Sequence, residues 1–347
     1  MKVLLFFSGQ SSLSHIFKQI FSIKSSDVEL VNYLDFLPHF YHRLHDKAGK
    51  MPGVIEQKIR DQYLKQIQLK YVEIINAKKP DLIFIYNDQM LCAETLDKVN
   101  KNIKIGVFLA DSPLFLQKRP HIIGLIRRAD VVFAPDTYWL EQCRMLGVKK
   151  AEYLIPGYNA QYHFKISPNS NQLEKYGSDV FFMGSPYNDN WGYKRALFLS
   201  KFCGFDFYFL GPDCWKEWFA YFPELADKWI LKKEYLSDEE LNIMMNCTKI
   251  IPVDANAGII NGLHIRVFDT IAAGVLPLIE YRKDLDCIFE NVDLPFIKNY
   301  NDIPDLVNYF INHNSERNAL VANLKNVVLK KYSHQNAADI IYTTLIP

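Results

Sequence analysis

Short runs of apolar residues alternate with longer amphipathic stretches along most of this chain, and that alternation constrains its fold more than any other feature. In the first half, each apolar run is bounded by turn residues and has the length of a buried strand. The runs are Val3 to Phe7, Asp81 to Tyr86, Ile103 to Ala110 and Asp130 to Ala134. Between them the spacing is helical, as in residues 54–76. Strands separated by helices predict a parallel, doubly wound sheet.

A second series of apolar runs follows an interruption marked by Pro156-Gly157, Pro168-Asn169 and Gly177. The runs are Val180 to Met183, Phe205 to Leu210, Lys249 to Val253 and Val275 to Glu280. The sequence therefore predicts an α/β chain of two Rossmann-like domains that face each other across a cleft. We expect the domains at residues 1–157 and 178–332, with a linker at residues 158–177.

The last segment, residues 333–347, is expected to form one more helix. Its apolar residues fall on a single stripe at helical spacing. The stripe consists of Ala337, Ile340, Ile341 and Leu345. Because a stripe of this kind needs a core to cover it, we expect this helix to cross back and pack on the first domain.

The balance of charges argues against a dedicated nucleic-acid-binding protein. Forty Lys and Arg residues face 39 Asp and Glu residues, a net charge of +1 that leaves no global field to hold a polyanion. Hydrophobic residues form 49% of the chain, which excludes intrinsic disorder. The first apolar run is too short for a secretory signal, and no later run approaches the roughly 20 apolar residues of a membrane span.

The six cysteines are scattered, and no two of them have the C-x-x-C spacing of zinc ribbons or redox dithiols. We therefore expect free thiols in a reducing compartment, and hence a cytoplasmic protein. A cluster of basic residues also suggests a surface that faces an anionic acceptor or contacts the inner face of a membrane peripherally, although solvated helix charges are the more common explanation. The cluster consists of Lys118, Arg119, His121, Arg127 and Arg128.

The turn after the first expected strand is a candidate site, because ligands of open parallel sheets bind beyond the carboxyl ends of the strands. This turn, from Ser8 to Ser12, has neither a Walker A pattern nor G-x-G-x-x-G. Its small residues Gly9, Ser11 and Ser12 favour a loop whose backbone N–H groups face an anion or let an acceptor substrate approach. A tight turn without a ligand explains the same residues.

Two residues of the first half are candidates for a catalytic base. His15 falls in the first turns of the expected helix, where a neutral imidazole would take a proton from an acceptor hydroxyl. Asp111 follows an apolar run, at the end of a strand where sites form. The alternatives are a partly buried His bonded to a carbonyl, and an Asp that begins a turn before Ser112-Pro113.

The most informative stretch lies between the last two expected strands. A loop of small residues ends at Asn261-Gly262, and a helix is expected from Leu263 to Ala273. His264 and Arg266 fall in its first turns, where free N–H groups and the positive end of the helix dipole favour a diphosphate. Arg266 adds a forked, charge-assisted donor.

Asp269 follows Arg266 by three residues and so lies on nearly the same face of that helix. One turn below a diphosphate, its carboxylate would accept hydrogen bonds from ribose hydroxyls. An Arg–Asp ion pair on the surface of an ordinary helix is the alternative.

The stretch from Asn261 to Gly274 reads N-G-x-x-x-R-x-F-D-x-x-A-x-G. It resembles the nucleotide-sugar helix of GT-B glycosyltransferases, especially the group related to spore maturation protein CgeB. Further segments are similar to that group in the same order along the chain. They are Val107 to Pro113, Asp179 to Ser185 and Gly211-Pro212.

The resemblance implies the roles of several residues. Arg266, with His264, Gly262 and Asn261, would bind the donor diphosphate, and Asp269 would bind the ribose. The family commonly has Glu where this chain has Asp269, whose reach is shorter by one methylene. GT-B enzymes usually work without a bound metal, and the chain has no D-x-D motif among its strand ends.

We therefore expect a metal-independent glycosyltransferase that moves a sugar from a UDP- or GDP-linked donor to a hydroxyl-type acceptor. The acceptor classes are a bacterial surface glycan, a lipid-linked glycan or a protein. The first domain would supply the acceptor side, with His15 or Asp111 as base if configuration is inverted. Two alternatives are a non-enzymatic protein that binds nucleotide sugars or acts as a scaffold, and a nucleotide-sugar epimerase.

Overall fold

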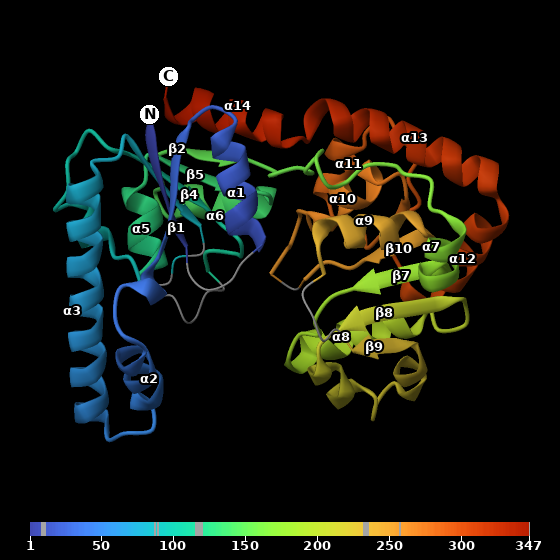
Figure 1. Cartoon of the computed structure of the whole chain (residues 1–347), viewed down its shortest axis with the longest axis horizontal. Coiled ribbons are helices and arrows are strands. Elements are labelled where there is room, and N and C mark those ends of the chain that lie inside the picture. The colour runs from blue at the N-terminus through green and yellow to red at the C-terminus, as the bar shows by residue number, and fades with distance from the viewer. Residues whose placement is uncertain are drawn as a thin grey trace. The chain divides into compact units, whose positions relative to one another are not determined.

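The computed structural model describes residues 1–7, 12–86, 88, 90–114, 121–231, 236–256 and 258–346. The chain forms two compact units (Figure 1). Unit 1 consists of Met1–Pro156 and Gln335–Pro347, and unit 2 of Gly157–His334. Each unit is built on a parallel sheet with helices packed around it, as the alternation of strands and helices in the sequence predicts.

Unit 1 contains a six-stranded parallel sheet with the order β2-β1-β3-β4-β5-β6. Its strands are β1 (Lys2–Phe7), β2 (Asp27–Asn32), β3 (Leu82–Tyr86), β4 (Lys104–Phe108), β5 (Val131–Ala134) and β6 (Ala151–Tyr153). The four central strands are the apolar runs of the sequence, and their residues are almost all buried. The two edge strands, β2 and β6, were not expected from the sequence because charged residues interrupt their apolar pattern.

The helices of unit 1 surround this sheet. They are α1 (Ser12–Ser22), α2 (His39–Ala48), α3 (Gly53–Lys78), α4 (Ala93–Leu96), α5 (Ile122–Arg128) and α6 (Thr137–Met145). A final helix, α14 (His334–Leu345), covers the same core, and its buried residues belong to one cluster with β1 and α1. These residues are Ala337, Ala338, Ile341 and Leu345.

Polar contacts also fix α14 to unit 1. Lys24 Nζ lies 2.5 Å from Asp339 Oδ1, and the hydroxyl of Tyr342 donates to the carbonyl of Phe21 at 3.2 Å. Ile340, expected in the buried stripe, is exposed, and Ala338 takes its place in the core. The last helix of the chain therefore completes the core of the first unit.

Unit 2 contains a five-stranded parallel sheet with the order β11-β10-β7-β8-β9. Its strands are β7 (Ser178–Met183), β8 (Phe207–Gly211), β9 (Trp229–Leu231), β10 (Thr248–Val253) and β11 (Leu276–Ile279). Its helices are α7 (Ser170–Tyr176), α8 (Asp189–Ser200), α9 (Asp238–Asn246), α10 (Arg266–Ala272), α11 (Asp284–Ile288), α12 (Ile303–Asn312) and α13 (Asn314–Lys331). The carboxyl ends of β7, β10 and β11 meet at one edge of this sheet, next to the start of α10.

The segment expected to be a linker, residues 158–177, belongs to unit 2 and is held there by side chains of α9. Asn242 and Asn246 each donate from Nδ2 to the carbonyl of Phe164 at 3.1 Å. The amide oxygen of Asn246 accepts from the N–H of Ile166 at 3.0 Å. The segment also contains α7, which begins with a capping box between Asn169 and Gln172. It is therefore an ordered part of the second unit.

Candidate functional site

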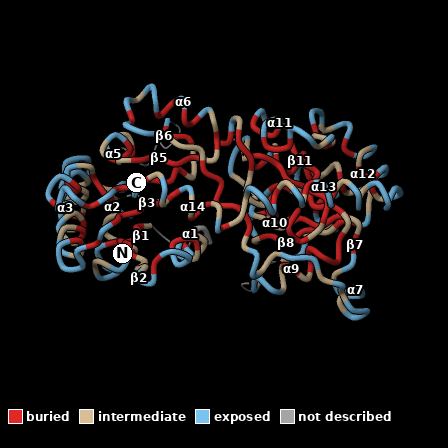
Figure 2. The backbone as a smooth tube through the Cα atoms, turned by 90° about the horizontal axis from the view of Figure 1, so that it is seen from above, coloured by how far each residue is buried: buried red, intermediate tan, exposed pale blue. Residues whose placement is uncertain are grey.

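The candidate site lies at the carboxyl edge of the sheet in unit 2, where charged side chains from several elements meet. Arg266 is the first residue of α10, Arg195 comes from α8, and Asp254 and Glu280 follow the ends of β10 and β11. Figure 2 shows that the strands beneath them form the buried centre of the unit. Strand ends in an open parallel sheet place such side chains where a ligand can reach them.

Arg266 is held over an aromatic ring and has an unused donor. The centre of its guanidinium lies 4.7 Å from the centroid of the Phe182 ring. Its Nη1 atom is buried and has no hydrogen-bond partner among the residues that the structure describes. Gly184 leaves room for it, because a Cβ at that position would lie 3.3 Å from Arg266 Nη2.

Arg266 remains a cation at neutral pH in spite of its surroundings. Burial, followed by the neighbouring charge of Arg195, lowers the pKa of Arg266 to about 10. An orphaned donor on a buried cation is costly to the free protein, since such groups normally have a partner. The arrangement is therefore suited to an anion that supplies the missing acceptor.

His264 lies before α10 rather than in its first turn, because the helix begins at Arg266 and not at Leu263. Its Nδ1 atom accepts from the backbone N–H of Arg266 at 3.1 Å. Burial, and then the charges of Arg266 and Arg195, lower the pKa of His264 to about 3. His264 is thus neutral, and because Nδ1 accepts, its proton is on Nε2, which can donate one further hydrogen bond.

Asp269 lies one turn into α10 and faces a histidine from the segment before α7. Its Oδ1 atom is 3.6 Å from Nε2 of His163, and the Nδ1 atom of His163 is buried without a partner in the described part of the chain. Burial raises the pKa of Asp269. Within the described residues no ion pair joins Asp269 to Arg266, so these two do not form the surface pair that was the alternative from the sequence.

Arg195 is bound by a carboxylate in a buried, bidentate ion pair. Its Nε donates to Asp254 Oδ2 at 2.7 Å, and its Nη2 donates to Oδ1 at 2.9 Å. Nη1 donates to the carbonyl of Ser185 at 2.7 Å, and the guanidinium stacks 4.1 Å from the Tyr187 ring centroid. Burial opposes the charge of Asp254, but Arg195 outweighs it and holds the pKa of Asp254 below its usual value.

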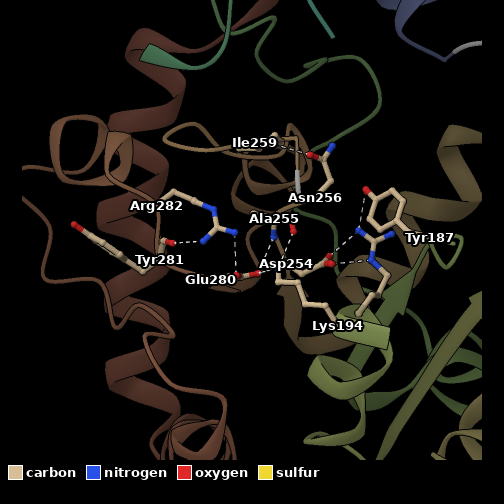
Figure 3. A network of polar contacts seen from close by, with 10 residues as sticks. Tyr187, Lys194, Asp254, Ala255, Asn256, Ile259, Glu280, Tyr281 and Arg282 are labelled. Atoms are coloured by element: carbon tan, nitrogen blue, oxygen red, sulfur yellow. Dashed lines mark hydrogen bonds and ion pairs between the residues drawn. The ribbon is translucent and has the colours of Figure 1, made fainter. Parts of the chain in front are cut away.

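A second network joins the ends of β10 and β11 (Figure 3). Lys194 Nζ donates to Glu280 Oε2 at 2.6 Å and to the carbonyl of Ala255 at 2.9 Å. The N–H of Ala255 donates to the same carboxylate at 3.1 Å. Arg282 donates from Nη2 to Glu280 Oε1 at 3.0 Å and from Nη1 to the carbonyl of Tyr281 at 2.8 Å. Glu280 is thus fixed between two cations, and it fixes the two strand ends to each other.

The candidates of the second half lie on α10 and on the loop before it, and the structure adds residues that the sequence did not single out. Asn261 and Gly262 lie on the loop that leads to α10, and the carbonyl of Asn261 accepts from the N–H of Asp284 at 2.9 Å. The signal that was missed is the position of Asp254 and Glu280, each directly after an apolar strand. Arg195 has no such signal, since it is one of several charges on α8.

The candidates of the first half lie in unit 1. His15 is an exposed residue of α1, and Asp111 is half-buried beyond the end of β4. β3 lies between the two strands that precede them. Gly9 and Ser11 lie outside the described residues, and Ser12 is the first residue of α1.

Of the basic cluster, Lys118 and Arg119 also lie outside the described residues. Arg128 is engaged within unit 1, where its Nε donates to Asp97 at 2.6 Å.

No helix in the described part of the chain is both long and apolar enough to cross a membrane. Within the described ranges, no three His, Cys, Asp or Glu side chains are grouped as a metal site would require. The six cysteines are free thiols.

Comparison with known proteins identifies the class of this fold. A family model described as glycosyl transferase-like matches residues 194–342, most of unit 2 and part of α14. No curated protein matches the chain in sequence.

Solved structures resemble the chain over its whole length. HepE of Anabaena in complex with UDP and glucose has 13% identity and a TM-score of 0.70, with 99% of each chain covered. Sucrose-phosphate synthase from Thermosynechococcus elongatus has 9% identity and a TM-score of 0.69, covering 99% of this chain and 98% of that chain. A glycosyltransferase from Rickettsia africae has 13% identity and a TM-score of 0.63, with 99% and 98% covered.

These likenesses define the fold as GT-B, with two Rossmann-like units, as the sequence predicts. The fold of the chain is therefore GT-B, and residues 194–342 match a glycosyl transferase-like family model.

Proposed function

We propose that this protein transfers a sugar from a nucleoside diphosphate to a hydroxyl-type acceptor, and that it belongs to the GT-B group related to spore maturation protein CgeB. The observation that carries the proposal is the buried, unpartnered Nη1 of Arg266, a cation in the described part of unit 2. The motif from Asn261 to Gly274 supports the proposed membership of the CgeB-related group. HepE was solved with UDP and with UDP-glucose, which favours UDP as the donor nucleotide.

Arg266 would act on the leaving diphosphate. Negative charge grows on this group as the bond to the sugar breaks, and a fixed cation stabilises that charge more than it stabilises the bound donor. Stacking on Phe182 keeps the guanidinium in place before the donor arrives. Nε2–H of the neutral His264 would add a second donor to the same group.

Asp269 would accept from the ribose hydroxyls. Burial raises its pKa, and hydrogen bonds from ribose hydroxyls would favour the charged carboxylate. His163 lies against the same carboxylate and would limit where the ribose fits. The side chain is one methylene shorter than the Glu common in the family, so the ribose would bind closer to α10.

Unit 1 would supply the acceptor side. His15, exposed on α1, or Asp111, beyond β4, would remove the proton from the acceptor hydroxyl if the reaction inverts configuration. The acceptor is a surface glycan, a lipid-linked glycan or a protein. In this proposal the cation and the imidazole stabilise the leaving group and no metal takes part. The free thiols fit a reducing, cytoplasmic compartment.

The proposal is tested by calorimetric titration with UDP- and GDP-sugars, followed by an assay for released nucleotide with and without a mixture of acceptors. Donor binding with nucleotide release that depends on an acceptor is the expected result. Binding without release across a broad set of acceptors would indicate a binding or scaffolding protein instead. Conversion of one nucleotide sugar into another without an acceptor would indicate an epimerase.

A further inference from the structure

A nearly buried histidine, His163, lies beside the carboxylate of Asp269 in unit 2. The side chain of His163 is 10% exposed, and that of Asp269 is 22% exposed. Nε2 of His163 lies 3.6 Å from Oδ1 of Asp269, and its Nδ1 is buried without a hydrogen-bond partner in the described part of the chain. Because buried polar atoms normally have a partner, an orphaned ring beside a candidate ligand-binding carboxylate calls for a physical explanation.

The backbone on both sides of His163 is fixed by hydrogen bonds. Its N–H donates to the carbonyl of Asn159 at 2.9 Å and so closes a turn before it. The next residue, Phe164, is bound twice by the side chain of Asn242 on α9: its N–H donates to Oδ1 at 3.3 Å, and its carbonyl accepts from Nδ2 at 3.1 Å. The imidazole is therefore presented to Asp269 from a held backbone rather than from a free loop.

A second histidine near His163 does not compete for it as a charged partner. His334 is buried, and its Nε2 has no partner among the described residues. Burial, followed by the charge of His163, lowers the pKa of His334 to about 4, so this ring is neutral at pH 7. Burial raises the pKa of Asp269, and His163 opposes that shift more than Arg266 does. Asp269 is thus the charged neighbour on which His163 acts.

The geometry of this pair fixes which atoms can bond. An ionised carboxylate only accepts, so Nε2 of His163 must carry a proton to bond to Oδ1 of Asp269. At 3.6 Å the contact exceeds the 2.7–3.2 Å of a hydrogen bond by less than about 1 Å. One further methylene would add about 1.5 Å to the side chain, which is more than this gap. The room beside His163 therefore fits an aspartate and not a longer carboxylate.

We propose that His163 is a positioning residue for ribose recognition: its Nε2–H holds Oδ1 of Asp269 and thereby directs Oδ2 to a ribose hydroxyl of the donor. The pair then selects ribonucleotides over deoxyribonucleotides, because a sugar that lacks this hydroxyl leaves a directed acceptor without its donor. The inference rests on the proposed function, in which Asp269 binds the ribose. His163 acts through Asp269, so it should affect donor affinity and leave turnover at saturating donor unchanged.

The test is calorimetric titration of uridine, of UDP, and of UDP analogues that lack the 2′ or the 3′ hydroxyl. His163→Ala should weaken the binding of uridine and of UDP by the same factor, about three- to tenfold, because the phosphates are not involved. Its preference for UDP over the deoxy analogues should fall by that factor as well. In His163→Gln an amide nitrogen donates from nearly the place of Nε2, so affinity should stay within about twofold of the wild type.

A pair of variants that exchange size separates positioning from a merely structural role. Asp269→Glu alone should lower the affinity for uridine about fivefold or more, because the longer carboxylate meets the ring of His163. In the double variant His163→Ala/Asp269→Glu the ring is absent, and part of that affinity should return. Two independent structural losses would add instead.

His313→Ala is the matched control, since it removes an exposed histidine of the same unit at the end of α12. It should bind every ligand as the wild type does, and melting temperatures are measured for all variants. Unchanged uridine affinity in His163→Ala while Asp269→Asn is weakened, or additive losses in the double variant, would overturn this inference alone. Wild-type affinity for uridine in Asp269→Glu, which keeps His163, would overturn it as well. A wild type that binds neither UDP nor uridine would overturn the proposed function together with the inference.

Discussion

Replacing Arg266 by Ala tests the central feature of the candidate site. The pKa of about 10 leaves this side chain charged at pH 7, and its Nη1 has no partner among the described residues. The free protein therefore loses no internal hydrogen bond from that atom. It loses the contact with Phe182, on the order of 0.5–1 kcal/mol, and is relieved of repulsion from Arg195. We expect the melting temperature to stay close to that of the wild type.

Binding of a nucleoside diphosphate should fall much more than stability does. A hydrogen bond to a charged group contributes about 1.5–3 kcal/mol, which corresponds to a loss of about ten- to 150-fold in affinity. Turnover should fall further, because the lost cation is needed most when the diphosphate leaves. Arg266→Lys should restore part of the affinity, since it keeps the charge without the forked geometry.

The measurement is calorimetric titration of UDP and GDP, with uridine and guanosine as ligands that lack phosphate. Arg128→Ala is the control, because it removes an arginine whose carboxylate partner, Asp97, is on the surface of unit 1. Unchanged diphosphate affinity in Arg266→Ala, in a protein that melts normally, would refute the assignment of Arg266 to the donor. A large drop in melting temperature would show that Arg266 has a structural partner.

Further predictions concern other residues of the two units. His15→Ala should lower turnover at least tenfold, and typically about 10²-fold, with unchanged donor affinity; equal losses in both would make His15 structural. Asp269→Asn should weaken the binding of uridine and of UDP by the same factor in the titrations above, because its proposed partner is the ribose. A loss of affinity for UDP alone would contradict this. Asp254→Asn should lower the free energy of unfolding, measured with urea, by about 3–5 kcal/mol, because it leaves Arg195 buried without its charged partner. A decrease below about 1 kcal/mol would contradict a structural ion pair. In the folded chain the pKa of His264 is about 3, well below its usual value, so the unfolded chain binds the proton first as the pH falls. The free energy of unfolding should therefore decrease as the pH falls below about 6.5, by up to about 1.4 kcal/mol per pH unit. His264→Gln should remove that part of the slope in urea unfolding between pH 6.5 and pH 4, and equal slopes in both proteins would show that His264 is not buried as a neutral ring.

The strands that carry the site could be predicted from the sequence because they are buried on both faces. Such strands read as short continuous apolar runs, as β7, β10 and β11 do. Edge strands lack this signal. β2 has charged residues at its first and third positions, and β6 has only three residues, so neither could be distinguished from a loop.

The site itself could be predicted only where its residues are close in sequence. Asn261, Arg266 and Asp269 lie on one loop and helix, and their spacing carries the information. The Arg195–Asp254 pair joins residues 59 positions apart, and no local pattern relates α8 to the end of β10. The start of α10 differs from the prediction, which began the helix at Leu263, because the Nδ1 of His264 accepts from the N–H of Arg266 and the helix begins at Arg266.

The charge of the assembled site bears on what it can bind. Lys194, Arg195, Arg266 and Arg282 bring four cations to this site, and Asp254, Glu280 and Asp269 bring three carboxylates. Asp254 is bonded to Arg195, and Glu280 is bonded to Lys194 and Arg282. The buried Nη1 of Arg266 has no such partner among the described residues. His264 adds no charge at neutral pH. An excess of positive charge in a partly buried place favours a ligand with more than one negative charge, as a nucleoside diphosphate has, over a neutral nucleoside or a free sugar. Affinity for the diphosphate should therefore fall with rising salt, while affinity for the nucleoside alone should not.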